Sequence, residues 1–233
     1  MARTSIATDD FNRASLGANW TNINVSNGGN MSIDSSIRIT GQYSSFGDDA
    51  NAAVVMWAGA GSFTNDQYSS LKLTNFITAG QGSSYPIGVV VRASGTGASR
   101  SYYAAVVKDS ASNTTRLFKV VSGTLTQLAT TTGTTWADND TISIECEGTS
   151  IKVYKNSSVI TALNSTDSSV TTGVPGIAGT NALYGDDWDG GDYTSSGPTS
   201  AALTGPTTGN TGSASTNFTV TLDAAATSTV TIT

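Results

Sequence analysis

The stretch DTISIECEGTSIKVYKN, residues 140–156, alternates apolar and polar residues in two runs that a glycine turn separates. Such alternation places every second side chain on the same face of a β-strand. One face carries five apolar side chains, namely Ile142, Ile144, Cys146, Ile151 and Val153. The other face carries polar side chains, namely Ser143, Glu145, Glu147 and Lys152. The stretch therefore predicts a β-hairpin in a sheet with one buried and one wet face, as in a β-sandwich.

The same alternation recurs along most of the chain, in runs that Gly, Asn, Asp and Ser clusters separate. It predicts strands at Asp10–Asn12, Trp20–Asn24, Met31–Ile33, Ile37–Thr40, Ala52–Trp57, Tyr68–Phe76, Ile87–Ala93, Tyr102–Lys108, Thr115–Val121, Thr124–Thr131, Asp140–Glu147, Ser150–Lys155 and Val159–Leu163. Hairpin turns are predicted at Ser122-Gly123, Gly148-Thr149 and Asn156-Ser157, because Gly and Asn tolerate positive φ. No segment of comparable strength has a helical period. The sequence therefore predicts an all-β antiparallel fold.

The composition narrows the possible functions. The 233 residues include only 12% charged residues, and the net charge is −6. The eleven Lys and Arg are scattered, which argues against nucleic acid as a partner. No run approaches the roughly 18 apolar residues of a membrane span, and the start MARTSIATDDFNR has no apolar signal-peptide core. We therefore expect neither nucleic acid nor a membrane as a partner.

The chain contains no histidine and one cysteine, Cys146. The absence of histidine excludes Ser-His-Asp and Cys-His catalysis and histidine metal ligands. A single cysteine excludes an internal disulfide framework. The most common forms of nucleophilic catalysis are therefore not available to this chain.

The alternating pattern stops at Thr194. The next stretch, residues 194–216, contains two Gly-Pro steps among Ser, Thr and Gly, which is typical of a linker. Residues 217–233 then show two strand-like runs, which cannot bury a core alone. We predict a sandwich over residues 1–193, a linker over 194–216, and over 217–233 either the first strands of another domain or strands that add to a neighbour.

Three stretches carry a resemblance to a known family. They are TDDFNRASLGANWTNI (8–23), the segment from SYYAAVVKDS (101–110) to KNSSVI (155–160), and GVPGIAGTNALYGDDWDGG (173–191). Together they resemble a laminin-G-like domain of the concanavalin A-like lectin and glucanase group, whose members are antiparallel jelly-roll β-sandwiches. The tail, residues 205–233, resembles the first strands of a bacterial Ig-like domain.

The resemblance implies a non-catalytic structural or binding module on a particle surface, because such domains are common in phage virion and bacterial surface proteins. We expect a phage capsid decoration or fibre-type protein on the virion surface, with weak glycan binding. Its partners would be other virion proteins, surface glycans and further copies of itself. The alternative is an extracellular or cell-surface carbohydrate-binding or glycoside hydrolase domain.

Carbohydrate contacts are predicted from aromatic and polar residues of the predicted strands. Sugar sites use exposed aromatic rings beside amide, carboxylate or guanidinium groups. Adjacent tyrosines on a strand send their rings to opposite faces, so one of Tyr102 and Tyr103 is a candidate even if the other is buried. The predicted carbohydrate-binding residues are Trp57, Arg92, Tyr102, Tyr103 and Asn156. The alternative is that the tyrosines are core and edge residues.

Glycoside hydrolysis is the enzymatic alternative. It needs two carboxyl groups on either side of the scissile bond. The only glutamates, Glu145 and Glu147, share a strand face about 7 Å apart. The Glu-x-Asp-x-Glu pattern of the enzymes in the resembled family is absent, and no aromatic platform flanks the pair. We therefore predict that the chain is not an enzyme.

The stretch LYGDDWDGGDY, residues 183–193, places four carboxylates within seven residues. Ca²⁺ takes clustered carboxylate and carbonyl oxygens. The resemblance implies that the first and last strands lie side by side, which would bring Asp10 to this stretch. The predicted calcium ligands are Asp10, Asp186, Asp187, Asp189 and Asp192. The alternative is a closing strand without metal, in which Phe11 and Trp188 point into the core.

Overall fold

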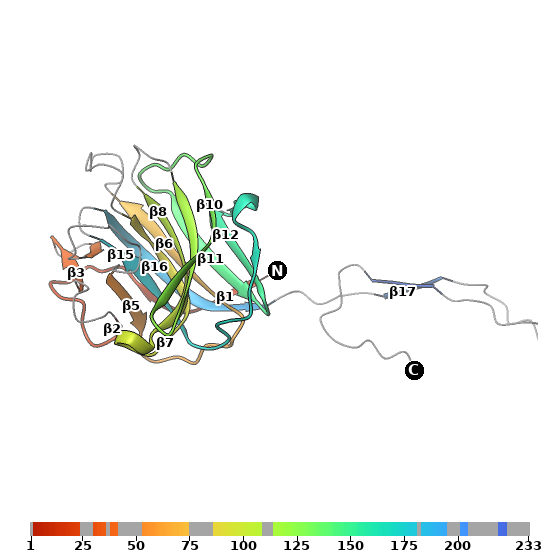
Figure 1. Ribbon diagram of the computed structural model, residues 1–233, viewed down its shortest axis with the longest axis horizontal. Coiled ribbons are helices and arrows are strands. Elements are labelled where there is room, and N and C mark those ends of the chain that lie inside the picture. The colour runs from red at the N-terminus through yellow and green to blue at the C-terminus, as the bar shows by residue number, and fades with distance from the viewer. Residues whose placement is uncertain are drawn as a thin grey trace, which may run out of the picture. The chain divides into compact units, whose positions relative to one another are not determined.

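The computed structural model describes residues 2–23, 30–35, 38–41, 53–74, 86–108, 114–180, 183–194, 201–204 and 219–222. The chain divides into two units, and Figure 1 shows the strands of the larger one. One unit is Arg3–Thr194, and the other is Ser195–Thr233 with Met1–Ala2.

Two sheets form the unit Arg3–Thr194. The first sheet runs in the order β13 (Ser158–Val159), β12 (Ser150–Lys155), β11 (Thr141–Glu147), β6 (Gln67–Thr74), β16 (Tyr184–Thr194), β4 (Arg38–Gly41) and β3 (Met31–Asp34); β1 (Ala2–Asp9) also pairs with β16, and β14 (Ser165–Thr166) with β12. The second sheet runs in the order β10 (Thr124–Thr131), β9 (Thr115–Val121), β8 (Ser101–Lys108), β7 (Pro86–Ser94), β15 (Val174–Gly179), β5 (Ala53–Trp57) and β2 (Trp20–Asn22). The only helical elements among the described residues are two 3₁₀ turns, η2 (Gly97–Ser99) and η3 (Thr161–Leu163).

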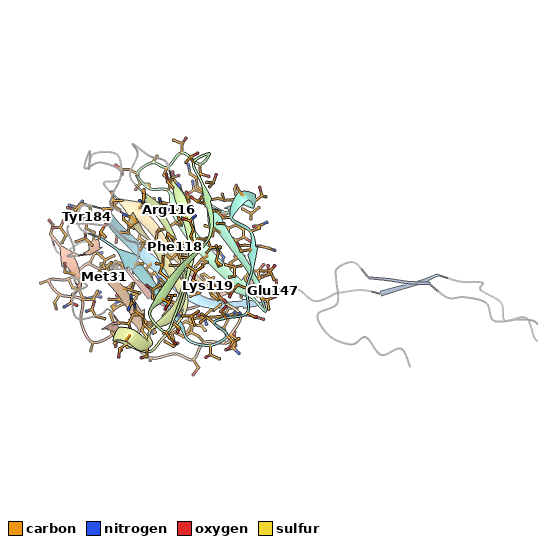
Figure 2. All side chains as sticks on the ribbon, in the orientation of Figure 1. Met31, Arg116, Phe118, Lys119, Glu147 and Tyr184 are labelled. Atoms are coloured by element: carbon orange, nitrogen blue, oxygen red, sulfur yellow. The ribbon has the colours of Figure 1, made fainter. Side chains whose placement is uncertain are left out.

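The two sheets pack face to face around one core, and the described side chains fill the space between them (Figure 2). Leu71 and Ile144 of the first sheet belong to the same buried cluster as Val89 and Val91 of the second. The strand pairs with a described register are all antiparallel, as in β11 and β12. The predicted all-β sandwich is therefore confirmed.

The inner strands of the second sheet, β7 and β8, are buried on both faces. Val89 and Val91 belong to the core between the sheets, whereas Val90 belongs to a separate buried cluster with Tyr102 and Phe118. Successive residues of a strand point to opposite faces. The uninterrupted apolar run of β7 therefore reflects burial on two sides.

The hairpin that begins the sequence analysis forms as predicted. Ile144 pairs with Val153, Cys146 pairs with Ile151, and both pairs lie in the core. The turns between neighbouring strands use positive φ, as at Ser122 (46°). The alternation therefore identified this hairpin and its buried face correctly.

Two predicted strands are wrong. The first strand is β1, and residues 10–12 lie beyond its end, because the Asp9 and Asp10 carboxylates accept hydrogen bonds from the backbone N–H groups of Phe11 and Asn12. These bonds replace ladder hydrogen bonds and turn Phe11 to a φ of 51°. The predicted strand Val159–Leu163 ends at Val159 and gives way to η3.

Some predicted boundaries differ by one or two residues, and Asn24, Ile37, Ala52 and Phe76 lie outside the described residues. The sequence analysis missed β14 and β15, and β16 was expected only as a closing strand and turn. In the other unit, β17 (Ala201–Thr204) pairs with β18 (Thr219–Leu222), so one of these strands lies within the predicted linker. None of the described helices is long and apolar enough to cross a bilayer.

Candidate functional site

An open pocket of about 610 Å³ lies where β1 ends beside the middle of β16. Ligand pockets typically have volumes of roughly 300 to 1,000 Å³, so this one has room for a small ligand. Its lining is mostly polar and includes four carboxylates. The lining residues are Thr8, Asp9, Asp10, Arg13, Asn19, Asp187, Trp188 and Asp189. We call it the acidic pocket.

A β-bulge in β16 forms one wall of the acidic pocket. Asp186 pairs with Lys72 of β6 and Asp189 pairs with Ser70, so three steps along β16 match two steps along β6. The bulge contains Asp187, whose φ is 44°. An extra residue in one strand re-aims the side chains that follow it. The carboxylates of Asp187 and Asp189 therefore line the pocket, while the Trp188 side chain between them is only 1% exposed.

Asp9 in the opposite wall is occupied by structural contacts. Its carboxylate accepts two hydrogen bonds from Arg13, at 2.5 and 2.6 Å, and one from the Trp20 indole N–H at 2.7 Å. Charge-assisted bonds with two parallel donors are among the strongest side-chain contacts. Asp9 therefore fixes the end of β1.

Two carboxylates of the bulged strand have partners outside the pocket. Asp187 forms an ion pair with Lys72 at 2.7 Å. Asp189 accepts hydrogen bonds from the hydroxyls of Ser5, at 2.6 Å, and Tyr68, at 2.8 Å. A carboxylate has about four lone-pair sites, so each can still accept further hydrogen bonds.

Negative charge is concentrated at the rim of the acidic pocket. The hydrogen bond from the Asn12 backbone N–H holds the pKa of Asp10 below its usual value. Burial raises the pKa of Asp186, and the nearby negative charges of Asp187 and Asp10 raise it further. Asp10 and the acids Asp187 and Asp189 of β16 line the same pocket, so they are neighbours, as the resemblance implied.

Aromatic rings support the pocket from inside the core. The Trp20 ring lies 4.7 Å from the Trp188 ring and 5.3 Å from the Trp57 ring, measured between centroids, and Phe11 lies 5.9 Å from Trp20. Edge-to-face and offset pairs in this range are attractive. The prediction that Phe11 and Trp188 point into the core is confirmed.

A second polar cluster adjoins the acidic pocket on the outer face of the first sheet, and three of its four side chains are buried. It consists of Tyr68, Glu145, Tyr154 and Tyr193, and we call it the tyrosine face. The Tyr68 hydroxyl connects the two sites through its bond to Asp189. Burial raises the pKa of Tyr193 to about 12, and the negative charge of Glu145 contributes to that rise.

Arg3 of β1 lies across the tyrosine face. Its guanidinium carbon is 5.0 Å from the centre of the Tyr68 ring and 5.5 Å from the centre of the Tyr154 ring. Its Nε donates a hydrogen bond to Glu145 Oε1 at 2.7 Å, and its Nη2 donates one to the Ser143 hydroxyl at 2.8 Å. A cation at these distances from a ring is attracted to it. Arg3 therefore joins the start of β1 to β6, β11 and β12.

The sequence analysis missed these residues, although one signal was present. The alternation in β12 places Tyr154 on the same polar face as Lys152, opposite Ile151 and Val153. That pattern alone indicated an aromatic ring on the wet side of the hairpin. No comparable local signal links Arg3 to Glu145, because 142 positions separate them in the chain.

The structure buries four of the five predicted carbohydrate-binding side chains. The exposed fraction is 8% for Trp57, 1% for Arg92, 2% for Tyr102 and 0% for Tyr103. The prediction treated one of the two tyrosines as exposed because their rings point to opposite faces. Both faces of the second sheet are covered at these positions, so these four side chains do not present a surface to a sugar.

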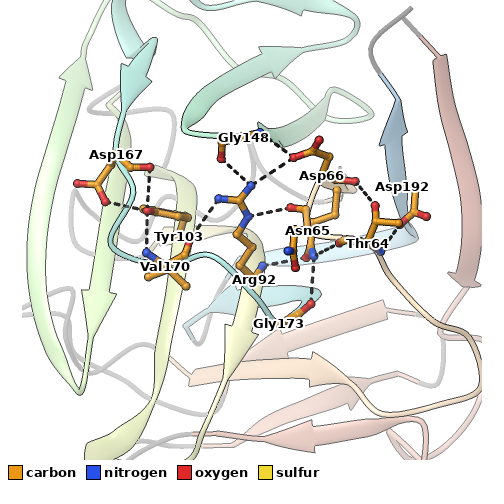
Figure 3. Close-up of polar contacts among 11 residues, drawn as sticks. Thr64, Asn65, Asp66, Arg92, Tyr103, Gly148, Asp167, Val170, Gly173 and Asp192 are labelled. Carbon is orange, nitrogen blue, oxygen red and sulfur yellow. Dashed lines mark hydrogen bonds and ion pairs between the residues drawn. The ribbon is translucent and has the colours of Figure 1, made fainter. Parts of the chain in front are cut away.

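Arg92 instead holds three chain segments together, as Figure 3 shows. Its guanidinium donates hydrogen bonds to the backbone carbonyls of Asn65 at 2.8 Å, Val170 at 3.0 Å and Gly148 at 2.8 Å. Its backbone N–H donates to the Gln67 side chain at 2.8 Å. A buried charge is tolerated when hydrogen bonds satisfy it, which explains why an arginine stands here.

Tyr103 has a similar structural role in the same region (Figure 3). Its hydroxyl donates to the Asp167 carboxylate at 2.7 Å and accepts from the Val170 backbone N–H at 3.0 Å. Lys119 forms an ion pair with the same carboxylate at 2.6 Å. Although burial opposes the shift, the hydrogen bonds from Lys119 and Tyr103 hold the pKa of Asp167 well below its usual range.

Asn156, the fifth predicted residue, lies away from the others. It lines a second open pocket of about 600 Å³ between the end of β10 and the segment from β13 to η3. Its side-chain amide donates to Asp140 at 2.6 Å and its side-chain oxygen accepts from the Thr141 backbone N–H at 2.7 Å. The five predicted residues therefore do not form one site.

The five predicted calcium ligands are only partly gathered. Asp10, Asp187 and Asp189 line the acidic pocket, whereas Asp192 accepts a hydrogen bond from the Thr64 backbone N–H. Within the described part of the chain, no three Asp, Glu or Cys side chains are grouped closely enough to hold a metal ion. The carboxylates have a chemistry suited to Ca²⁺, but their present positions would have to change to enclose one. Calcium binding stays a prediction.

Comparisons with solved structures identify the architecture. The chain is 16% identical to the carbohydrate-binding module CBM66 from Bacillus subtilis, with a TM-score of 0.52, over 76% of this chain and 94% of that one. It is 13% identical to a β-glucanase from Bacillus licheniformis, with a TM-score of 0.50, over 82% of this chain and 99% of that one. The fold is a jelly roll. At such low sequence identities, the likeness shows only that the fold is shared.

This jelly roll also matches the GH43 protein BlXynB from Bacillus licheniformis, with 14% identity and a TM-score of 0.55, over 80% of this chain but 39% of that one. No protein-family model and no curated protein sequence matches the chain. None of the three structures is named as a virion protein. The virion role and location, the Ig-like tail and the homo-oligomer stay predictions.

Proposed function

We propose that this jelly roll is a non-catalytic carbohydrate-binding module that holds a sugar in the acidic pocket. The observation that carries the proposal is the lining of that pocket. Asp10, Asp187 and Asp189 offer acceptors for sugar hydroxyls, while Asn19 offers amide groups. A pocket with a few convergent polar groups is the usual form of a small-ligand site. The fold shared with a carbohydrate-binding module adds support.

The charge of the pocket limits the sugars that it can take. Its lining contains four carboxylates and a single guanidinium, that of Arg13, which Asp9 already neutralises. Like charges at close range disfavour binding of an acidic ligand. We therefore propose neutral sugars as ligands, with uronic acids excluded.

The arrangement of the two glutamates supports a binding function over hydrolysis. Glu145 is 5% exposed and is held by Arg3, while Glu147 follows it on the same face of β11. A glycosidase needs both carboxyl groups free to reach the glycosidic bond. Release of reducing ends from laminarin or xylan should therefore be absent. Release that disappears in the double variant Glu145→Gln/Glu147→Gln would contradict a non-catalytic module.

Affinity electrophoresis tests the binding proposal directly. The chain is run through gels that contain laminarin, lichenan, xylan, levan or polygalacturonate. We expect at least one of the four neutral polysaccharides to retard it, and polygalacturonate to leave it unretarded. Asp187→Asn should weaken the retardation several-fold, because it replaces a charged acceptor in the pocket with a neutral amide.

A matched control separates the pocket from general charge effects. Asp34→Asn also removes one carboxylate and one surface ion pair, with Arg38, but at the β3–β4 hairpin. This variant should bind as the unchanged chain does. Equal weakening by both variants, or no retardation by any neutral polysaccharide, would contradict the proposed site.

A further inference from the structure

The contact between Arg3 and Glu145 crosses much of the first sheet. β1 pairs with β16, and β16 is followed in the sheet by β6 and then β11. In a flat sheet β1 and β11 would lie roughly 14 Å apart, which is three strand spacings of about 4.8 Å. Their side chains nevertheless form a hydrogen bond of 2.7 Å. The contact therefore indicates that the sheet curves toward this outer face.

Gly191 lets the backbone of β1 approach β16 closely on the line that leads to Glu145. Gly191 pairs with Tyr68, and Tyr68 pairs with Glu145, so the three positions lie on one line across the sheet. A Cβ atom on Gly191 would lie 2.0 Å from the carbonyl oxygen of Thr4 in β1. No side chain fits at this position, so β1 can lie close enough to β16 for Arg3 to reach Tyr68 and Glu145.

Arg3 covers the groups on this face that could bind a sugar. Its guanidinium lies over the rings of Tyr68 and Tyr154, which are the surfaces that would stack on a sugar ring. It also occupies Oε1 of Glu145, an acceptor for sugar hydroxyls. The Arg3 side chain itself is 32% exposed, whereas Glu145 beneath it is buried.

The contact between Arg3 and Glu145 leaves one buried hydrogen-bond acceptor without a donor. Oε2 of Glu145 is buried and has no donor in hydrogen-bonding geometry, although the Tyr154 and Tyr193 hydroxyls lie near this carboxylate. A guanidinium usually binds a carboxylate through two parallel bonds, but here one arm of Arg3 bonds to Ser143 instead. An unpaired buried oxygen lowers the stability of the fold. A ligand with neighbouring hydroxyls could satisfy both oxygens of Glu145, which Arg3 does not.

Release of Arg3 requires little of the fold to change. Arg3 is the second residue of β1, and strand ends open at a lower free energy than strand centres. The rest of β1 would stay fixed by the contacts of Asp9 with Arg13 and Trp20. The end of the strand can therefore move while the acidic pocket stays formed.

We propose that the tyrosine face extends the carbohydrate site of the acidic pocket and that Arg3 is the plug that closes it. This inference rests on the proposed binding function and adds its regulation. Displacement of Arg3 uncovers the rings of Tyr68 and Tyr154 and the Glu145 carboxylate for a second neutral sugar unit. Asp189 joins the two halves, because it lines the pocket and accepts the hydrogen bond from Tyr68.

The test compares Arg3→Ala with the unchanged chain by isothermal titration with laminarihexaose, xylohexaose and a levan-derived fructohexaose. We expect Arg3→Ala to bind the preferred hexasaccharide about tenfold more tightly, because no plug has to be displaced. The double variant Arg3→Ala/Glu145→Gln should lose most of this gain, because the amide is a poorer acceptor. Monosaccharide affinity should not change, because one unit fills only the acidic pocket.

A second measurement needs no substitution. The side-chain Nε–H signal of Arg3 in the unchanged chain should lose its protection from solvent exchange when the preferred hexasaccharide is added. Equal hexasaccharide affinity in folded Arg3→Ala and in the unchanged chain would contradict the proposal that Arg3 closes the tyrosine face. An Nε–H signal that stays protected at saturation would contradict it as well. Neither result would contradict the proposed binding function. Absence of hexasaccharide binding in both proteins would contradict the binding function as well.

Discussion

Arg92 and Arg3 are both held by hydrogen bonds and ion pairs, but their surroundings differ. Arg92 is buried, and its guanidinium donates to three backbone carbonyls. Arg3 is about one-third exposed, and the carboxylate that it binds keeps one oxygen without a donor. A satisfied buried charge holds a fold together, whereas an exposed and incomplete contact can be exchanged for a ligand. The same residue type therefore serves structure in one place and regulation in the other.

The largest effect is expected for Arg92→Met. The substitution leaves the carbonyls of Asn65, Gly148 and Val170 without their donor, and loss of one partner from a buried charged network typically costs about 3 to 5 kcal/mol. Urea unfolding at pH 7 measures the change. Asp34→Asn, which breaks a surface ion pair on the β3–β4 hairpin, is the control and should cost less than about 1 kcal/mol. Similar losses in both variants would contradict the structural role of Arg92.

The region around Arg92 should also depend on pH through Asp167. Its folded pKa is lowered by Lys119 and Tyr103, so its stabilising effect is complete above the pKa of the unfolded chain, near 4, and is lost as the pH falls toward the folded pKa. Asp167→Asn should cost about 2 kcal/mol at pH 7. Urea unfolding at pH 7 and pH 3 should show a smaller difference from the unchanged chain at pH 3. A difference independent of pH would contradict this assignment.

A smaller loss of stability is expected for Arg3→Ala. The variant leaves the Glu145 carboxylate buried without its cation, but Arg3 is partly exposed, so we expect a cost of about 1 to 2 kcal/mol. The double variant Arg3→Ala/Glu145→Gln should recover part of it, because the remaining group is neutral. Thermal unfolding measures both. A loss as large as that of Arg92→Met would remove the contrast between the two arginines.

Asp187→Asn should change stability still less. Its ion pair with Lys72 lies at the surface, and such pairs contribute about 0 to 1 kcal/mol. The same variant should weaken glycan binding, so affinity and stability should separate. If glycan affinity fell only in proportion to stability, Asp187 would be a structural residue and not a ligand contact.

Calcium would have the smallest effect on the fold. The acids near the pocket already have protein partners, so a calcium ion that bridges Asp10 and Asp187 is expected to raise the thermal midpoint by only a few degrees. Thermal unfolding is compared in millimolar CaCl₂ and in EDTA, with MgCl₂ as the control. Equal midpoints in calcium and EDTA would contradict the predicted ion.

The local pattern was sufficient for the hairpins. The alternation in residues 140–156 identified the core side chains of β11 and β12, whereas the position of the β16 acids beside Asp10 was implied only by the family resemblance. The pattern failed at residues 10–12, where the Asp9 and Asp10 carboxylates accept hydrogen bonds from the backbone and end the strand. It also failed for Tyr102 and Tyr103, because alternation assigns a residue to a face without saying whether that face is covered.

The sequence by itself determined the all-β class, the faces of the central hairpin and the absence of histidine chemistry, because these depend on residue type and short-range spacing. Only the tertiary structure decided which strands are neighbours. The pairing of β1 with β16 beside the bulge assembled the acidic pocket, and the same pairing carried Arg3 across Gly191 to Glu145. Contacts between residues more than a hundred positions apart depend on how the whole chain packs, and the local periodicity of the sequence does not predict them.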